Sequence, residues 1–246
     1  MHLTEAGRIT FDQAALAIIA VRDAMQPSGR DDVEVRGRVS MTVPTELATS
    51  WLPPLLNRFK QLHPAVDTII HADDAALHLG GSDHEISLRT EFTNEPKRGA
   101  DTAAVFPLEL VCNPALLSGL PESLLDRLSR LAFIGSRHQL LDGKLFAVDR
   151  KRRRDVMLAV NPDFTINNRQ VALELARKGF GAALLISVST SDDLENHTLE
   201  RLSEDHGFGY VIVSVVMRDP LPSSAATAMQ EFLLSSEKAL IQALDK

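Results

Sequence analysis

The sequence predicts an α/β fold with two lobes, preceded by a single helix. Two observations predict this class. From residue 38 onward, short strand patterns alternate with amphipathic helix patterns in the order β-α-β-α-β, which is typical of a parallel sheet covered by helices. The second half of the chain repeats the same alternation, so we expect a second α/β lobe there.

The opening helix carries a narrow apolar stripe. Its members are spaced alternately three and four residues apart, which is the heptad pattern by which one helix meets another. Pro27-Ser28-Gly29 stops the helix. We expect residues 1–30 to be a linker and dimerisation helix, although a helix lying on its own domain would give a similar pattern. The stripe consists of Phe11, Ala14, Ile18, Val21 and Met25.

The first lobe begins with an alternating strand over 38–43. Pro44 closes this strand, and Thr45 is a plausible N-cap for a helix over 46–62. His63-Pro64 ends the helix, because the residue before a proline is disfavoured in the α region. The next elements are strands over 66–71 and 85–89, with a short helix between them that follows Asp73-Asp74 and ends near Gly80-Gly81.

The second lobe is predicted from shorter patterns, and Gly179 is the expected C-cap of one of its helices. The final strand and helix lie at 210–217 and 223–244. The other elements are strands over 109–112, 131–134, 164–166 and 182–186, a hairpin of 145–148 with 156–160, and helices over 121–128 and from Asn167-Asn168 to Lys178.

The composition excludes several classes of protein. The chain has 246 residues, of which 44% are hydrophobic and 24% charged, and its net charge of −7 argues against wrapping nucleic acid. Cys112 is the single cysteine, so no intrachain disulfide forms and a reducing compartment is expected. No signal peptide and no apolar run long enough for a membrane span are present. We therefore expect a cytoplasmic protein that needs no cofactor.

Candidate ligand contacts lie where strands end and helices begin. Ligands of open parallel sheets bind beyond the carboxyl ends of the strands, where helix N-termini offer unpaired N–H groups. Thr45, Ser136 and Asn167 occupy such places. Plain capping or a plain turn would explain each of them as well.

Two charged candidates accompany these residues. Asp73-Asp74 stand at a strand end and could recognise a cationic or hydroxylated ligand, or could simply cap a helix. Arg89 ends a predicted strand and could bind an anionic ligand or pair with Glu91. We include Asp74 and Arg89 among the expected ligand contacts.

Other motifs favour no chemistry. Asp74 and His78 share a helix face and lie near His71 and His84, but their spacing is weak support for a metal, so we expect no metal site. No serine lies in a recognisable catalytic motif, so we expect no enzyme. The basic run 150–154 lies in a hairpin turn and is interpreted as solvated, and Cys112 is interpreted as a buried, inert thiol.

Several motifs, in order along the chain, resemble the LysR-type transcriptional regulators. The first matches the start of the linker helix of that family, and the others cover nearly the whole chain. They are Leu3-Thr4-Glu5-Ala6-Gly7-Arg8, Gly37-Arg38-Val39-Ser40, Leu52-Pro53-Pro54-Leu55-Leu56, His63-Pro64, Glu85-Ile86-Ser87-Leu88-Arg89, Val111-Cys112-Asn113-Pro114-Ala115-Leu116-Leu117 and Arg177-Lys178-Gly179-Phe180-Gly181-Ala182-Ala183-Leu184-Leu185.

The resemblance implies a linker helix followed by an effector-binding domain with two Rossmann-like lobes and a cleft between them, of the type 2 periplasmic-binding-protein kind. Lobe I would comprise 31–106 and 209–246, and lobe II 107–208. In relatives the loops that correspond to Thr45, Ser136 and Asn167 line the effector cleft, and the linker helices pair in a homodimer or tetramer. This sequence departs from the family at Ile186, where many relatives have proline.

The resemblance implies a ligand-sensing regulatory module. The helix-turn-helix that precedes Leu3 in the family is absent from the sequence, so we expect DNA contact only through a helix-turn-helix domain that this chain does not carry. Two alternatives remain open. One is a standalone cytoplasmic small-molecule-binding protein of the same fold, and the other is a natural truncation that modulates a full-length regulator.

Overall fold

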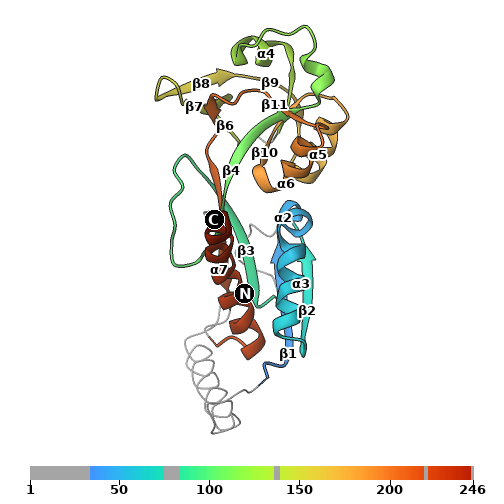
Figure 1. Ribbon diagram of the computed structural model, residues 1–246, viewed down its shortest axis with the longest axis vertical. Coiled ribbons are helices and arrows are strands. Elements are labelled where there is room, and N and C mark those ends of the chain that lie inside the picture. Colours follow the sequence, from blue (N-terminus) through green and yellow to red (C-terminus); the bar gives the residue numbers. More distant parts are fainter. Residues whose placement is uncertain (1–33, 75–83, 136–138, 219–220, 245–246) are drawn as a thin grey trace, which may run out of the picture.

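The longest strand, β4 (Thr102–Cys112), runs from one half of the molecule into the other (Figure 1). A computed structural model describes residues 34–74, 84–135, 139–218 and 221–244, with side chains up to residue 236. Residues 102–107 of β4 pair with β13 (Tyr210–Met217), whereas residues 108–112 pair with β10 (Ala182–Ile186) and β11 (Glu200–Arg201). The two-lobed α/β class is therefore confirmed.

The sheet of lobe I has the strand order β2-β1-β3-β13-β4. Strands β1 (Gly37–Val43), β2 (Val66–Ala72) and β3 (Ile86–Thr93) are parallel, as the alternation of strands and helices predicted. Strand β13 alone runs in the opposite direction, because it returns from lobe II between β3 and β4 and is antiparallel to both. The first three strands are thus parallel as expected, and β13 makes the sheet as a whole mixed.

The helix expected over 46–62 is two helices, α2 (Thr45–Ser50) and α3 (Leu52–Leu62), separated at Trp51. The break has a local cause. Pro53 and Pro54 have no N–H to donate, and a proline ring inside a helix collides with the carbonyl four residues earlier, so the chain starts a new helix with proline in its first turn. The break leaves α2 as a short helix at the junction of the lobes.

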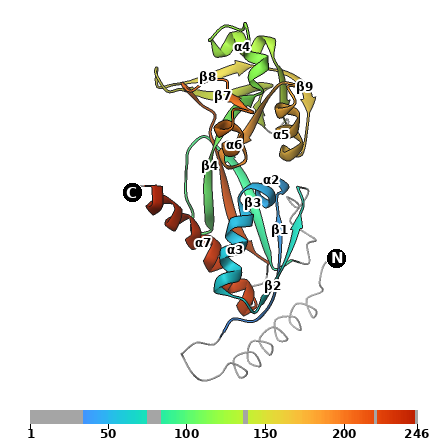
Figure 2. The same ribbon diagram turned by 45° about the vertical axis from the view of Figure 1, so that its right-hand side comes forward.

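The core of lobe I lies between the sheet and the pair of helices α3 and α7 (Ser224–Leu244) (Figure 2). Val39, Met41 and Val43 alternate on β1 and are fully buried. Phe59 of α3 is also buried, with its ring centroid 5.3 Å from that of Phe232 on α7. This packing explains why the alternation of 38–43 predicts a strand with one buried face.

Lobe II contains two small sheets. In one, β10 and β9 (Asn161–Thr165) lie parallel to β5 (Ala132–Gly135) on either side of it. The other contains the predicted hairpin of β7 (Lys144–Asp149) and β8 (Arg154–Ala159). The remaining elements are β6 (Leu140–Leu141), β12 (His206–Gly207), the 3-10 turn Pro114–Leu117, α4 (Leu124–Arg130), α5 (Arg169–Arg177) and α6 (Ser187–Glu195).

Helix α6 is absent from the sequence prediction. Its sequence is rich in Ser, Thr and Asp, which have modest helix propensity, and it lacks a clear apolar stripe. Tertiary contacts hold it instead. Thr190 donates to Glu109 at 2.6 Å, and Asp193 accepts from Arg177 Nε at 2.9 Å and from Arg177 Nη2 at 2.7 Å. Glu109 and Arg177 both lie outside α6 in the sequence. The residues of the helix alone therefore do not predict it.

Several predictions lie outside the described residues. They are the linker helix with its heptad stripe, the short helix expected after Asp74, and Ser136. Within the described part of the chain, no helix combines the length and the apolar character needed to cross a membrane.

Candidate functional site

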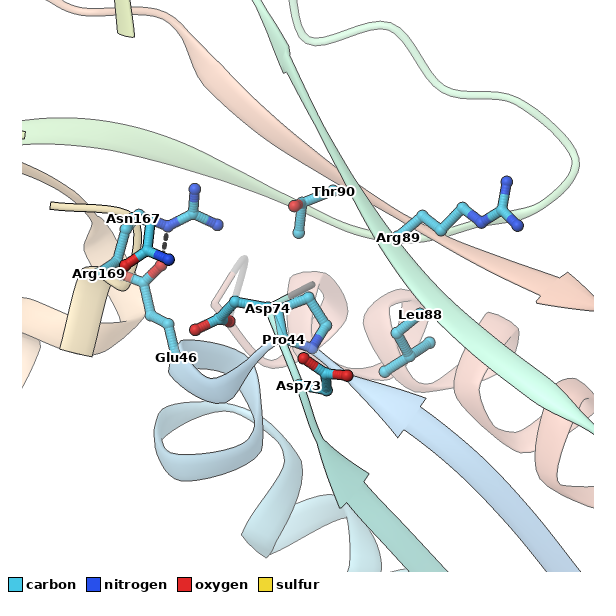
Figure 3. Close-up of a pocket in the computed structure, with 9 residues that line it drawn as sticks. All are labelled: Pro44, Glu46, Asp73, Asp74, Leu88, Arg89, Thr90, Asn167 and Arg169. Carbon is cyan, nitrogen blue, oxygen red and sulfur yellow. Dashed lines mark hydrogen bonds and ion pairs between the residues drawn. The ribbon is translucent and has the colours of Figure 1, made fainter. Parts of the chain in front are cut away.

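A cavity of about 70 Å³ lies where the two lobes meet (Figure 3). The carboxyl ends of β1, β2 and β9 converge here, which is where ligands of open parallel sheets bind. Lobe II contributes Asn167 and Arg169 to the lining. Lobe I contributes Pro44, Glu46, Asp73, Asp74, Leu88, Arg89 and Thr90.

Glu46 of α2 is a buried carboxylate that reaches into lobe II. Glu46 is 2% exposed. Its Oε2 forms an ion pair with Nε of Arg169, the first residue of α5. Its Oε1 accepts a hydrogen bond from the Ser189 hydroxyl at 2.8 Å and lies 3.4 Å from the Ile186 N–H. Figure 3 shows Glu46 and Arg169 pointing toward one another. The carboxylate is therefore desolvated but fully partnered.

Asp74 forms a second link between the lobes. Its Oδ1 accepts from the Thr45 N–H at 2.8 Å, and its Oδ2 accepts from the Asn168 amide. Asn168 also caps α5, because its Oδ1 accepts from the Val171 N–H at 2.9 Å. One carboxylate thus joins the N-termini of α2 and α5.

A third link is the hydrogen bond from Thr49 Oγ1 to Gln170 Oε1 at 3.1 Å. The guanidinium carbon of Arg169 also lies 5.2 Å from the centre of the Phe92 ring, in a cation–π contact between α5 and β3. On another side of Phe92 lies a hollow of about 390 Å³, lined mainly by apolar side chains of the crossing strands and lobe II. These contacts hold the lobes together along α2, α5 and α6.

Asp74, Asn167 and Arg89, which the sequence proposed as contacts, all line the cavity, and Thr45 adjoins it. Thr45 is not the N-cap: Pro44 holds that position, and Asp74 takes the role of capping side chain. In the part of the chain that the structure describes, Arg89 has no ion pair with Glu91 and its Nε is buried without a hydrogen-bond partner. Figure 3 shows its side chain directed away from Asn167.

Sequence reasoning missed Glu46, Arg169 and Ser189. A glutamate in the first turn of a helix is ordinarily an exposed residue that complements the helix dipole, so Glu46 gave no sign of burial. One signal was present: Ile186, singled out as a departure from the family, supplies the N–H that lies near Glu46. A proline at that position has no N–H.

The other sequence candidates are placed as follows. Residues 150–153 of the basic run form the exposed turn between β7 and β8, and Arg154 begins β8; Lys151 pairs with Asp205 at 2.6 Å. Cys112 is buried, and this burial raises the pKa of its thiol to about 12, so the thiol is inert at neutral pH. Among the described residues, no group of three or more potential ligands could hold a metal ion.

Fold and site define a two-lobed α/β domain with a cavity between its lobes. Residues 33–237 match the LysR substrate binding domain, and the chain belongs to this family, whose members are the ligand-sensing domains of LysR-type transcriptional regulators. The chain is 25% identical over 111 residues to a probable HTH-type transcriptional regulator, LtrA of Klebsiella pneumoniae. That match covers 45% of this chain and 35% of LtrA.

Solved structures share the fold. The full-length structure of the Vibrio cholerae virulence activator AphB aligns with a TM-score of 0.65 at 16% identity, and the alignment covers 95% of this chain and 80% of AphB. The effector domain of AmpR from Pseudomonas aeruginosa aligns with a TM-score of 0.67 at 15% identity, covering 85% of this chain and all of that domain. At these identities the likeness concerns the fold.

Proposed function

We propose that this chain senses a small-molecule effector that binds between its lobes. The observation that carries the proposal is the cavity itself, which both lobes line and whose lining includes Glu46, Asp74 and Arg169, three residues that form polar links between the lobes. In the described part of the chain, no hydrogen bond engages the Asn167 side chain, and Arg89 Nε is unpartnered. These groups, with Thr45, Asp74 and Ser136, are the proposed effector contacts.

The proposed mechanism is a shift between two lobe arrangements. An effector that binds one arrangement more tightly changes the population of both, and the lobe angle then alters the geometry of a dimer or tetramer. The division into 31–106 with 209–246 and 107–208 is supported by β4, whose pairing partner changes from β13 at Pro107 to β10 at Leu108. The hinge would lie at this change of partner.

The wider biological role follows from the family. We propose that residues 1–30 pair with their counterpart in a second subunit and that DNA is contacted through a helix-turn-helix domain. We further propose that the protein works in the cytoplasm as a regulator and not as an enzyme. Its output would be a change in transcription when the effector binds.

A thermal-shift screen against a panel of metabolites tests the proposed function. An effector present at 100 times its dissociation constant should stabilise the folded chain by about 2.7 kcal/mol. For an effector found in this way, replacing Asn167 with Ala should weaken binding about 2- to 12-fold, because one hydrogen bond is lost. Isothermal titration of both proteins measures the ratio.

The matched control is Asn196→Ala, which removes an exposed amide elsewhere in lobe II and should leave the affinity unchanged. Equal affinity of the Asn167→Ala variant and the parent would show that the effector does not contact Asn167. An effector whose binding survives replacement of Asn167, Asp74 and Arg89 together would place the site outside this cavity.

A further inference from the structure

The inter-lobe contact at Glu46 has the chemistry of a bound carboxylic acid. The carboxylate comes from lobe I, and its three donors, Arg169, Ser189 and the Ile186 N–H, all come from lobe II. Each carboxylate oxygen has its own donors. The exposed fraction of the Glu46 side chain is 2%, so water contributes little to solvating the charge. Lobe II therefore holds Glu46 as a receptor holds a ligand.

We propose that Arg169, Ser189 and the Ile186 N–H form a carboxylate-binding site, that Glu46 fills it while the lobes are together, and that the effector carries a carboxylate that takes the place of Glu46. This inference rests on the proposed function, because it names the chemical class of the ligand for the same cleft.

The donors select a carboxylate over a neutral amide. The guanidinium of Arg169 supplies a full positive charge at Oε2, and a charge-assisted hydrogen bond is about twice as strong as a neutral one. On the other oxygen, Ser189 and the Ile186 N–H both donate. Ile186 is the last residue of β10 and the N-cap of α6, and Ser189 lies in the first turn of this nine-residue helix, whose N-terminus favours negative charge. A neutral amide has only one oxygen. Its NH₂ group would therefore face either Arg169 or the Ser189 and Ile186 donors, where an acceptor is needed.

Glu46 competes with a free ligand for this site. The cavity of about 70 Å³ beside Glu46 is far smaller than the roughly 300–1,000 Å³ of typical ligand pockets, so a metabolite fits only after the lobes separate. Separation withdraws Glu46 and leaves Arg169 and Ser189 free. The apparent affinity for an effector is then reduced by the fraction of molecules that are open. Glu46 is thus an internal competitor that sets the effector concentration to which the protein responds.

Acetate and the Glu46→Ala variant test the carboxylate-binding site directly. The substitution removes a CH₂–COO⁻ unit, which acetate can replace. If the site binds acetate with a dissociation constant near 10 mM, 100 mM acetate should raise the melting temperature of Glu46→Ala by about 3–6 °C more than that of the parent. The parent corrects for the general effect of acetate on protein stability. A titration of Glu46→Ala with acetate should saturate.

Three controls test whether Arg169, Ser189 and the Ile186 N–H bind the acetate. Acetamide, the neutral analogue, should give no extra stabilisation of Glu46→Ala. The double variant Glu46→Ala, Arg169→Met lacks the cation and should lose the response to acetate. Glu174→Ala, which removes an exposed carboxylate from α5, should respond as the parent does. Equal responses of Glu46→Ala, the double variant and the parent would overturn the proposal, and so would acetamide acting as well as acetate.

The Glu46→Gln variant tests the competition with the effector. The side chain keeps its size but no longer neutralises Arg169, so a carboxylate effector from the metabolite screen should bind it at least tenfold more tightly than the parent. Weaker or unchanged binding, or a cleft-binding effector without a carboxylate, would overturn the competition. The acetate response needs no effector, so it can fail while the proposed function stands, and it can succeed even if the screen finds no ligand.

Discussion

Replacing Arg169 with Met is expected to separate the lobes and to abolish tight binding of a carboxylate effector. The substitution leaves Glu46, which is 2% exposed, without its cation. Removing one partner of a buried ion pair typically costs about 3–5 kcal/mol, because the remaining charge is desolvated and uncompensated. Here the molecule can relieve that cost by opening the cleft and returning Glu46 to water. The loss of stability should therefore be smaller, about 2–3 kcal/mol.

Urea unfolding measures the change in stability, and titration measures the change in effector affinity, which should fall about 30-fold or more when a buried charged contact is lost. Lys178→Met is the matched control, because Lys178 is an exposed cation at the opposite end of α5. If the Arg169 and Lys178 variants unfolded at the same urea concentration, the Glu46 pair would contribute nothing to holding the lobes.

Replacing Asp193 with Asn should cost about 2–3 kcal/mol at neutral pH, the range for a hydrogen bond to a charged group. Asp193 of α6 accepts from Arg177, the last residue of α5, at 2.7 Å. Burial alone would raise the pKa of Asp193, but hydrogen bonds from Arg177 and Thr198 and the charge of Arg177 hold it below its usual value. The pair fixes the two helices that present Arg169 and Ser189.

The effect of Asp193→Asn should depend on pH in a defined direction. Because the folded-state pKa lies below the unfolded value, the stabilisation is fully present above about pH 5 and is lost as the pH falls through the folded pKa. The difference in unfolding free energy between parent and variant should shrink between about pH 4.5 and pH 3. Glu174→Gln removes the charge of the more exposed partner of Arg177 and should cost less than about 1 kcal/mol. A difference that stays constant down to pH 3 would contradict the assignment.

The fold was predictable because its elements carry local signals. Three local signals predicted elements that appear in the structure. They are the alternation over 38–43 for a strand, the His63-Pro64 pair for the end of α3 and Gly179 for the end of α5. The boundaries that failed depend on distant contacts. Strand β4 starts at Thr102 because β13 pairs with it, and α6 forms because Glu109 and Arg177 hold its polar side chains.

The sequence predicted where the candidate site lies but not which side chains interact there. Strand ends and helix starts marked Thr45, Asp74 and Asn167, because the rule for open sheets depends only on topology. The rule does not say which side chain crosses the cleft. Glu46 and Arg169 are 123 residues apart, and only the docking of the lobes makes a polar first-turn residue the most buried carboxylate of the site.

The three inter-lobe links have a functional consequence. Each joins the N-terminal part of α5 in lobe II to a polar side chain of lobe I, so all three would break together in the rotation of the lobes proposed above. A ligand that competes for one link weakens the others, because the same rotation separates all three. We therefore expect the contacts of Glu46, Asp74 and Thr49 to form and break together.

The distance between the lobes tests the central claim most directly. Spin labels at Arg58→Cys on α3 and Ser129→Cys on α4 would report it, since both positions are exposed and Cys112 is too buried, with a pKa of about 12, to compete for the label. Pulsed dipolar spectroscopy should show one distance distribution for the free protein and a shifted one when the effector from the screen is saturating. Glu46→Ala without ligand should move toward the shifted distribution. An effector that binds this cavity and leaves the distance unchanged would contradict the claim that ligand binding is coupled to the lobe angle.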